Sequence, residues 1–287
     1  MEHLWILLSL TAAFTLATSD ALTKKALSTH NEYIVAWLRL VLSLPLLFVF
    51  FSFIPVPRLD RDFYIAFFLA LPLEIASIVL YIKALKLSPL SLTVPFLALT
   101  PIFLIFVSYL ILGEKVSLKG IAGIIFIASG SYMLNISRIR EGIFEPFRAI
   151  MKEKGSVLMI GVALIYSLTS ALGKMAVEHS SPLFFGTTYF TALVIFFTPI
   201  ALYKGRKVEG KAVLPVLLPG IFYSLMIASH MVAINLAKVA YVISIKRMSL
   251  IFGVLYGYLL FKEEKIRERL LGAMLMFVGF VMVVTAE

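Results

Sequence analysis

The sequence lacks cysteine and is poor in charge. Its 287 residues include no Cys, which excludes disulfides, thiolate metal sites and a cysteine nucleophile. The four histidines, at positions 3, 30, 179 and 230, are not spaced like metal ligands, so we expect no metal. Charged residues make up only 15% of the chain and hydrophobic residues 61%, whereas a soluble protein is about a quarter charged. This composition argues against a water-soluble globule.

Long hydrophobic runs extend over the whole chain. A helix needs about 20 apolar residues to cross a hydrocarbon core. Ten such runs are present, at about 4–22, 33–54, 63–85, 90–112, 118–136, 157–177, 183–203, 213–236, 240–261 and 268–286. The first has no basic start and no clear cleavage site, so we expect it to be retained. Because the runs are continuously apolar rather than alternating, they predict an all-α polytopic membrane protein and not a barrel.

The two halves of the chain resemble each other. Glu114 is followed by glycines nine and sixteen residues later, and Glu263 repeats this pattern 149 residues further on. Lys24 and Lys174 lie in similar segments at an offset of 150. Such agreement indicates a duplication, with repeats at 1–137 and 155–287 joined by a polar linker at 138–154. Since five is odd, the second copy must enter the membrane inverted, an architecture that suits alternating access.

Both halves resemble the EamA repeats of the drug/metabolite transporter superfamily. The resemblance rests on the Glu-to-Gly pattern at the fifth and tenth runs and on the segment Ile245-Lys246-Arg247-Met248-Ser249 before the tenth. It implies a metabolite carrier or exporter with ten spans that works without a bound cofactor or ATP hydrolysis. It names no substrate, and it implies that both termini lie in the cytoplasm.

The distribution of positive charge favours the opposite orientation. Of the Lys and Arg residues in the gaps and at the ends of the runs, six fall on the side that holds the termini and seventeen on the other. In short loops, the side with more Lys and Arg is expected to be cytoplasmic. We therefore predict that both termini lie outside the cell membrane. The net charge of +10 suits anionic lipid headgroups as partners rather than nucleic acid.

Two adjacent cations lie inside the ninth run. Lys246 and Arg247 are six or seven residues from its start, about 10 Å deep at 1.5 Å per residue. Charge at that depth is costly, so it is kept for a reason. Neighbouring helical residues point about 100° apart, so we expect one of the pair to face a central cavity and bind substrate. The alternative is structural pairing with another helix.

The third and eighth runs carry matching polar stripes. Glu74 is the deepest acid, and Tyr81 lies on the same helical face two turns later. The repeat offset places Tyr223 and His230 at the equivalent positions. We predict that both stripes face one cavity, with Glu74 or His230 carrying protons. The alternative for Glu74 is an ion pair with a buried neighbour such as Lys246, and a lone His is often only a satisfied polar side chain.

Further candidates lie nearer the ends of the runs. Arg39 beside Trp37 fits either an interfacial anchor or an aromatic and cationic binding wall. Asp20 is a gating candidate four residues before Lys24, close enough for a local ion pair. For Lys24 and Lys174 we favour snorkelling to the membrane surface over gating.

Proline and glycine mark possible breaks and contacts. Pro95 and Pro101 interrupt the fourth run and indicate either a hinge or a static kink. Close helix packing is expected at the repeated glycines, which are Gly123, Gly130, Gly272 and Gly279.

Together these features predict a secondary transporter. A small metabolite, such as an amino acid or organic acid, would bind near the midplane between the halves, with its acidic group on the ninth-run cations. We weighed a membrane-embedded lipid-modifying enzyme, but no hydrolytic, metal or nucleotide motif is present. A channel or scaffold would need a filter-like loop or large soluble regions. Whether the protein is a monomer or a homodimer stays open.

Overall fold

The computed structural model describes residues 3–87, 94–135, 154–205, 210–261 and 266–286, and every regular element in these ranges is a helix. The expected linker at 138–154 therefore lies almost wholly outside the described residues. In chain order the helices are α1 (Leu4–Leu27), α2 (Glu32–Phe51), α3 (Arg61–Leu87), η1 (Val94–Leu99), α5 (Thr100–Leu112), α6 (Leu118–Asn135), α8 (Lys154–Glu178), α9 (Pro182–Gly205), η3 (Gly210–Ala212), α10 (Val213–Leu236), α11 (Val239–Lys246), α12 (Ser249–Phe261) and α13 (Ile266–Val284).

The long helices have the length and composition of membrane spans. Seven apolar stretches in the described ranges are long enough to cross a membrane, and three shorter ones lie at Phe96–Leu112, Leu118–Met133 and Leu271–Val284. Large apolar side chains such as Leu110 and Leu118 are exposed on the outside, where lipid rather than water would cover them. The chain is thus a multi-pass membrane protein.

Local sequence signals set several helix ends. The Asn31 side chain caps α2 by accepting a hydrogen bond from the Tyr33 amide at 2.9 Å. Gly113 ends α5 with a φ of 68°, which a glycine adopts without strain. The Gly113 amide then donates to the Tyr109 carbonyl at 3.0 Å.

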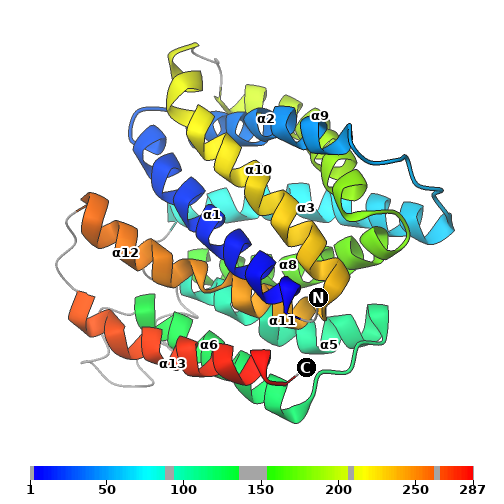
Figure 1. Ribbon diagram of the computed structural model, residues 1–287. Coiled ribbons are helices and arrows are strands. Elements are labelled where there is room, and N and C mark those ends of the chain that lie inside the picture. The colour runs from blue at the N-terminus through cyan, green and yellow to red at the C-terminus, as the bar shows by residue number, and fades with distance from the viewer. Residues whose placement is uncertain (1–2, 88–93, 136–153, 206–209, 262–265, 287) are drawn as a thin grey trace.

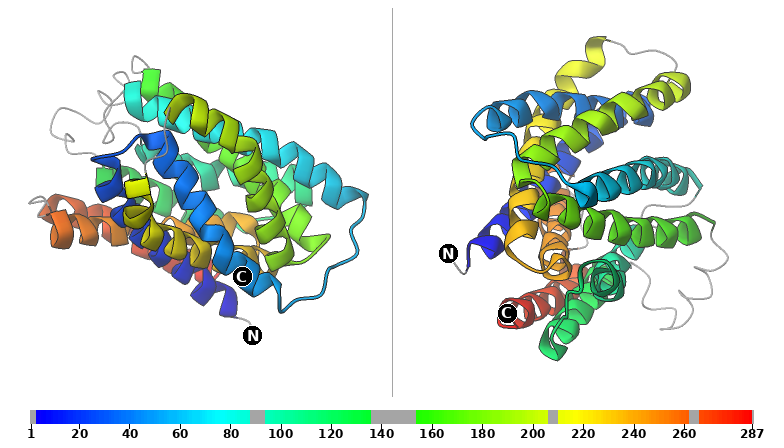
Figure 2. Two further views of the ribbon diagram at one scale, coloured as in Figure 1. Left: turned by 90° about the horizontal axis from the view of Figure 1, so that it is seen from above. Right: turned by 90° about the vertical axis from the view of Figure 1, so that its right-hand side faces the viewer.

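Packing joins helices from different halves of the sequence. The main contacts are those of α1 with α10, α3 with α8, α2 with α9, and α6 with α13. The α6–α13 pair forms one edge of the molecule, and α2 and α9 form the opposite edge (Figures 1 and 2). The start of α1 and the end of α13 lie at the same end of the molecule (Figure 1).

Glycines allow α6 and α13 to touch closely, as the sequence predicted. A Cβ added at Gly130 would lie 2.5 Å from the carbonyl oxygen of Gly272, and one at Gly123 would lie 2.8 Å from that of Gly279. Both distances are too short for carbon against oxygen. The backbones therefore approach only because these positions carry no side chain.

Two of the expected runs are not single α-helices. In the fourth run, the 3₁₀ turn η1 passes into α5 at Thr100, near the two prolines. In the ninth run, α11 ends at Lys246 and α12 begins at Ser249. The second break was not predicted, because no proline or glycine marks it. Both breaks lie next to polar side chains inside the helix bundle.

Candidate functional site

Lys246 lies in a group of polar side chains inside the helix bundle. Its Nζ is 3.4 Å from Nε2 of His230 on α10. It is also near Glu74 of α3, which faces the Thr169 hydroxyl of α8. The Nδ1 atom of His230 is buried and has no hydrogen-bond partner among the described residues. An amine, a carboxyl group, an imidazole and a hydroxyl thus lie near one another.

Arg247 points to a different helix from Lys246, as expected for adjacent residues. Its Nη2 donates to the Thr100 hydroxyl at 2.9 Å. Thr100 is the first residue of α5, so this bond ties the break in the ninth run to the break in the fourth. The Arg247 Nε is buried and unpaired within the described ranges, which leaves one guanidinium donor for another acceptor.

Arg39 connects α2 to both halves. Its Nη1 donates to Oδ1 of Asp20 at 2.7 Å. Its guanidinium carbon lies 4.5 Å from the centre of the Tyr223 ring, a cation–π contact. The Asp20 side chain is 56% exposed. Asp20 therefore pairs with Arg39 on α2.

Tyrosines lie between these charged groups. Tyr81 of α3 is near Asp20, Arg39 and Arg247. Tyr166 of α8 is near Tyr81 as well, and it also approaches Glu74, Tyr223 and Arg247. We call the whole group the interior cluster; its members are Asp20, Arg39, Glu74, Tyr81, Thr100, Tyr166, Thr169, Tyr223, His230, Lys246 and Arg247.

Some expected site residues lie elsewhere. Trp37 donates from Nε1 to the Thr198 hydroxyl of α9 at 2.8 Å, and a binding wall that it would share with Arg39 stays a prediction. Pro101 is in the first turn of α5. Lys24 is in the last turn of α1, and the side chain of Pro95 lies outside the described part of the chain.

Lys174 does not snorkel, which corrects the expectation from sequence. Its side chain is 8% exposed and forms an ion pair with Glu114, whose side chain is 9% exposed. Its Nζ also donates to the carbonyl of Ala237 at 2.8 Å. The buried acid and the carbonyl compensate the charge inside the protein, so the side chain need not reach the membrane surface.

Sequence reasoning missed several members of the interior cluster. Thr100 and Thr169 were not predicted, because threonine hydroxyls in apolar helices commonly bond to their own backbone. Thr169 does so weakly, at 3.5 Å from the Tyr166 carbonyl. No signal in the sequence marked Tyr166. The lysine partner of Glu114 was also missed, although both residues were noted as repeat markers.

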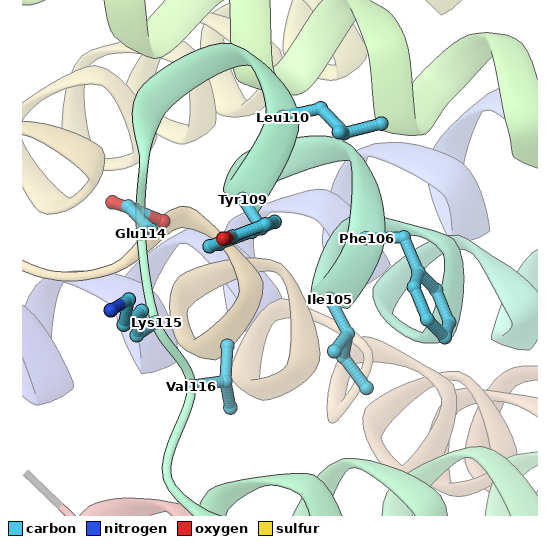
Figure 3. Close-up of a pocket in the computed structure, with 7 residues that line it drawn as sticks. All are labelled: Ile105, Phe106, Tyr109, Leu110, Glu114, Lys115 and Val116. Carbon is cyan, nitrogen blue, oxygen red and sulfur yellow. The ribbon is translucent and has the colours of Figure 1, made fainter.

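A hollow of about 440 Å³ shares no lining residue with the interior cluster, and Figure 3 shows its lining. It is lined by α5 and the following connection, through Ile105, Phe106, Tyr109, Leu110, Glu114, Lys115 and Val116. Phe106 and Leu110 point away from Glu114 (Figure 3) and are 66% and 79% exposed. The lining is mainly apolar and faces outward, so we take the interior cluster as the candidate site.

The chain is similar in sequence and fold to known proteins. No curated protein matches it. A solved structure described only as "Crystal structure of protein" has a TM-score of 0.81 over 99% of both chains, at 14% sequence identity, and this shows a shared fold. The model of the EamA-like transporter family matches residues 3–136 and again 153–285. The chain therefore belongs to the EamA-like transporter family, whose members transport small substrates across membranes.

Proposed function

We propose that the chain is a secondary transporter, a permease that moves a small metabolite outward across the cell membrane by alternating access. The observation that carries this proposal is the interior cluster. It brings acids, bases and hydroxyls from both halves of the chain together within helices whose outer surface is apolar. Charge at such depth is costly unless it serves binding or pairs with opposite charge.

The helix pairing supports ten crossings in two inverted halves. If the second half repeats the first, α1 corresponds to α8 and α3 corresponds to α10. The contact of α1 with α10 then becomes, on exchange of halves, the contact of α3 with α8, and both are extensive. The contacts of α2 with α9 and of α6 with α13 are each exchanged with themselves. This is the pattern of a pseudo-two-fold axis, and it suits two conformations of similar energy.

The chemistry of the interior cluster favours an organic acid or amino acid as substrate. Lys246 and the unpaired Nε of Arg247 suit a carboxylate or a phosphate group. Glu74 would accept an ammonium group, and Tyr81 and Tyr223 would cover an apolar part. No part of this scheme needs a cofactor, a metal or nucleic acid.

Proton coupling would use groups that already lie near one another. Glu74, Lys246 and His230 form a short series across α3, α11 and α10. Protonation of Glu74 would remove its attraction for Lys246 and free the ammonium group for substrate. A proton entering with each exchange cycle would then drive export.

Flux into vesicles tests this proposal. Purified protein is reconstituted with a panel of amino acids, organic acids and cationic drugs, with Lys246→Gln as the test variant. We expect Lys246→Gln to lower flux by about tenfold or more, the size of a lost charged contact. Lys204→Gln, which alters an exposed lysine, serves as the matched control. Equal flux in the two variants, or no flux of any solute by the unmodified protein, would contradict the proposal.

A further inference from the structure

Glu114 and Lys174 hold the short turn between α10 and α11 from two sides. The Nζ of Lys174 donates to the carbonyl of Ala237 at 2.8 Å. The carboxylate of Glu114 accepts from the amide of Val239, at 3.0 Å to Oε2 and 3.4 Å to Oε1. The lysine and the carboxylate also pair with each other. We call Glu114, Lys174 and the turn 237–239 the turn clasp.

The turn clasp caps a helix from outside that helix. α11 begins at Val239, and its N-cap residue Lys238 makes no capping hydrogen bond through its side chain. Glu114, from the connection after α5, supplies the missing acceptor. A carboxylate is favourable at this end because the helix dipole is positive there.

α11 leads directly from the turn clasp to the interior cluster. It has eight residues and ends at Lys246, with Arg247 next, so it is about 12 Å long at 1.5 Å per residue. Val239 and Lys246 are thus only about two helical turns apart. A displacement of the turn at Val239 would therefore be passed along α11 to Lys246 and Arg247.

We propose that Glu114 and Lys174 are positioning residues that hold α11 in place and close the interior cluster toward the membrane face carrying the α10–α11 turn. This inference rests on the proposed transport function. In the structure both side chains are nearly buried, and separating them would leave two charges unpaired unless water reached both. Glu114 and Lys174 are thus either paired with each other or hydrated. The paired state corresponds to the closed form of that face, and the hydrated state to the open form.

Cysteine labelling tests the turn clasp. The protein has no Cys, so Ser244→Cys introduces one thiol on α11, at a side chain that is fully buried in the closed state. A membrane-impermeant maleimide is applied to vesicles from each face in turn. We expect slow labelling of this reporter from the face carrying the turn.

The decisive variant is the exchange Glu114→Lys with Lys174→Glu. It keeps an ion pair, but an ammonium group would then face the Val239 amide and a carboxylate would face the Ala237 carbonyl. We expect labelling of the reporter to be about fivefold faster or more, the lower end of typical coupling between linked states. An ion pair that only stabilises the fold predicts the original rate, and this result would overturn the proposal.

Glu178→Gln is the matched control. Glu178 lies 3.6 Å from Lys174 but is 44% exposed, and no described contact joins it to the turn, so labelling should not change. If the exchanged protein fails to reach the membrane, Glu114→Gln replaces it, and a rate equal to that of Glu178→Gln would overturn the proposal.

Labelling is measured without substrate, so it separates the two proposals. Absence of flux in the unmodified protein would contradict transport, while the labelling rates would still decide whether the turn clasp closes that face. In the flux assay, loss of positioning should raise the KM for substrate, since Lys246 and Arg247 would be displaced. A lower maximal rate with unchanged KM would contradict the link to the site.

Discussion

At the scale of single residues, the adjacent cations Lys246 and Arg247 contact different helices. The sequence placed both deep in the ninth run and predicted that they point in different directions. In the structure Lys246 contacts His230, and Arg247 donates a hydrogen bond to Thr100. Thr100 could not be predicted as the partner of Arg247, because it lies 147 residues away in the sequence. His230 lies only 16 residues before Lys246, on the preceding helix α10. The binding roles of Lys246 and Arg247 stay predictions.

Glu74 is the residue through which we expect protons to act. Glu74→Gln keeps the size of the side chain but cannot lose a proton. We expect the variant to exchange substrate across vesicles at a rate near that of the unmodified protein, but to lose uphill transport driven by a pH gradient, by about tenfold or more.

Counterflow and gradient-driven uptake measured on the same vesicles check this prediction. Glu178→Gln, at an exposed acid, is the control and should keep both activities. Unchanged gradient-driven transport by Glu74→Gln would rule out the proposed proton carrier.

At the scale of elements, the sequence predicted helix type well and helix continuity less well. Apolar runs determine where helices lie, because an unpaired backbone cannot be exposed to lipid. The break between α11 and α12 has no such signal. Beside this break, Arg247 donates a hydrogen bond to Thr100 of α5, a tertiary contact that a single run of sequence does not contain.

The glycine contact between α6 and α13 gives a test of packing. Gly130→Ala would place a methyl group against the Gly272 carbonyl, and the two helices would have to move apart. We expect a loss of about 1 to 3 kcal/mol in stability, the usual cost of overpacking. Thermal unfolding in detergent measures it.

Gly253→Ala is the matched control, since a Cβ at Gly253 would meet nothing within 4 Å. It should be neutral or slightly stabilising, because alanine favours a helix over glycine. Equal loss of stability in both variants would mean that helix propensity, and not the α6–α13 contact, explains the effect.

At the scale of the whole molecule, a polar link joins α3 and α8 outside the membrane spans. Nδ1 of His179 lies 2.6 Å from Oδ2 of Asp60, and Nε2 lies 3.9 Å from Asp62. The Asp60 carboxylate also accepts from the Phe63 amide at 3.0 Å. The hydrogen bond to Asp60 raises the pKa of His179, and Asp62 and Glu178 add to this effect. The Phe63 amide and His179 lower the pKa of Asp60.

These shifts predict a pH window for stability. Because the pKa of His179 is raised, the link to Asp60 stabilises the fold fully at pH values below 6.5, the ordinary pKa of histidine. This stabilisation is lost as the pH rises through the raised pKa. Because the pKa of Asp60 is lowered, its contacts stabilise the fold fully at pH values above 3.8, the ordinary pKa of aspartate. This stabilisation is lost as the pH falls through the lowered pKa. The link is therefore strongest between these two ordinary values.

Thermal unfolding at about pH 5.5 and about pH 8.5 measures this contribution. The fall in Tm from the lower to the higher pH should be smaller in Asp60→Asn than in the unmodified protein. The variant lacks the carboxylate charge that stabilises protonated His179. An identical fall in both proteins would show that other groups cause the pH dependence.

The pairing of α1 with α10, α2 with α9 and α3 with α8 has a consequence for synthesis of the protein. The first three helices have their main neighbours in the second half of the chain. They leave the ribosome before those neighbours exist and must wait in the bilayer without them. A chaperone or insertase that shelters the early helices would act in that interval, and a chain cut short at its centre would offer the quality-control proteases an incomplete bundle.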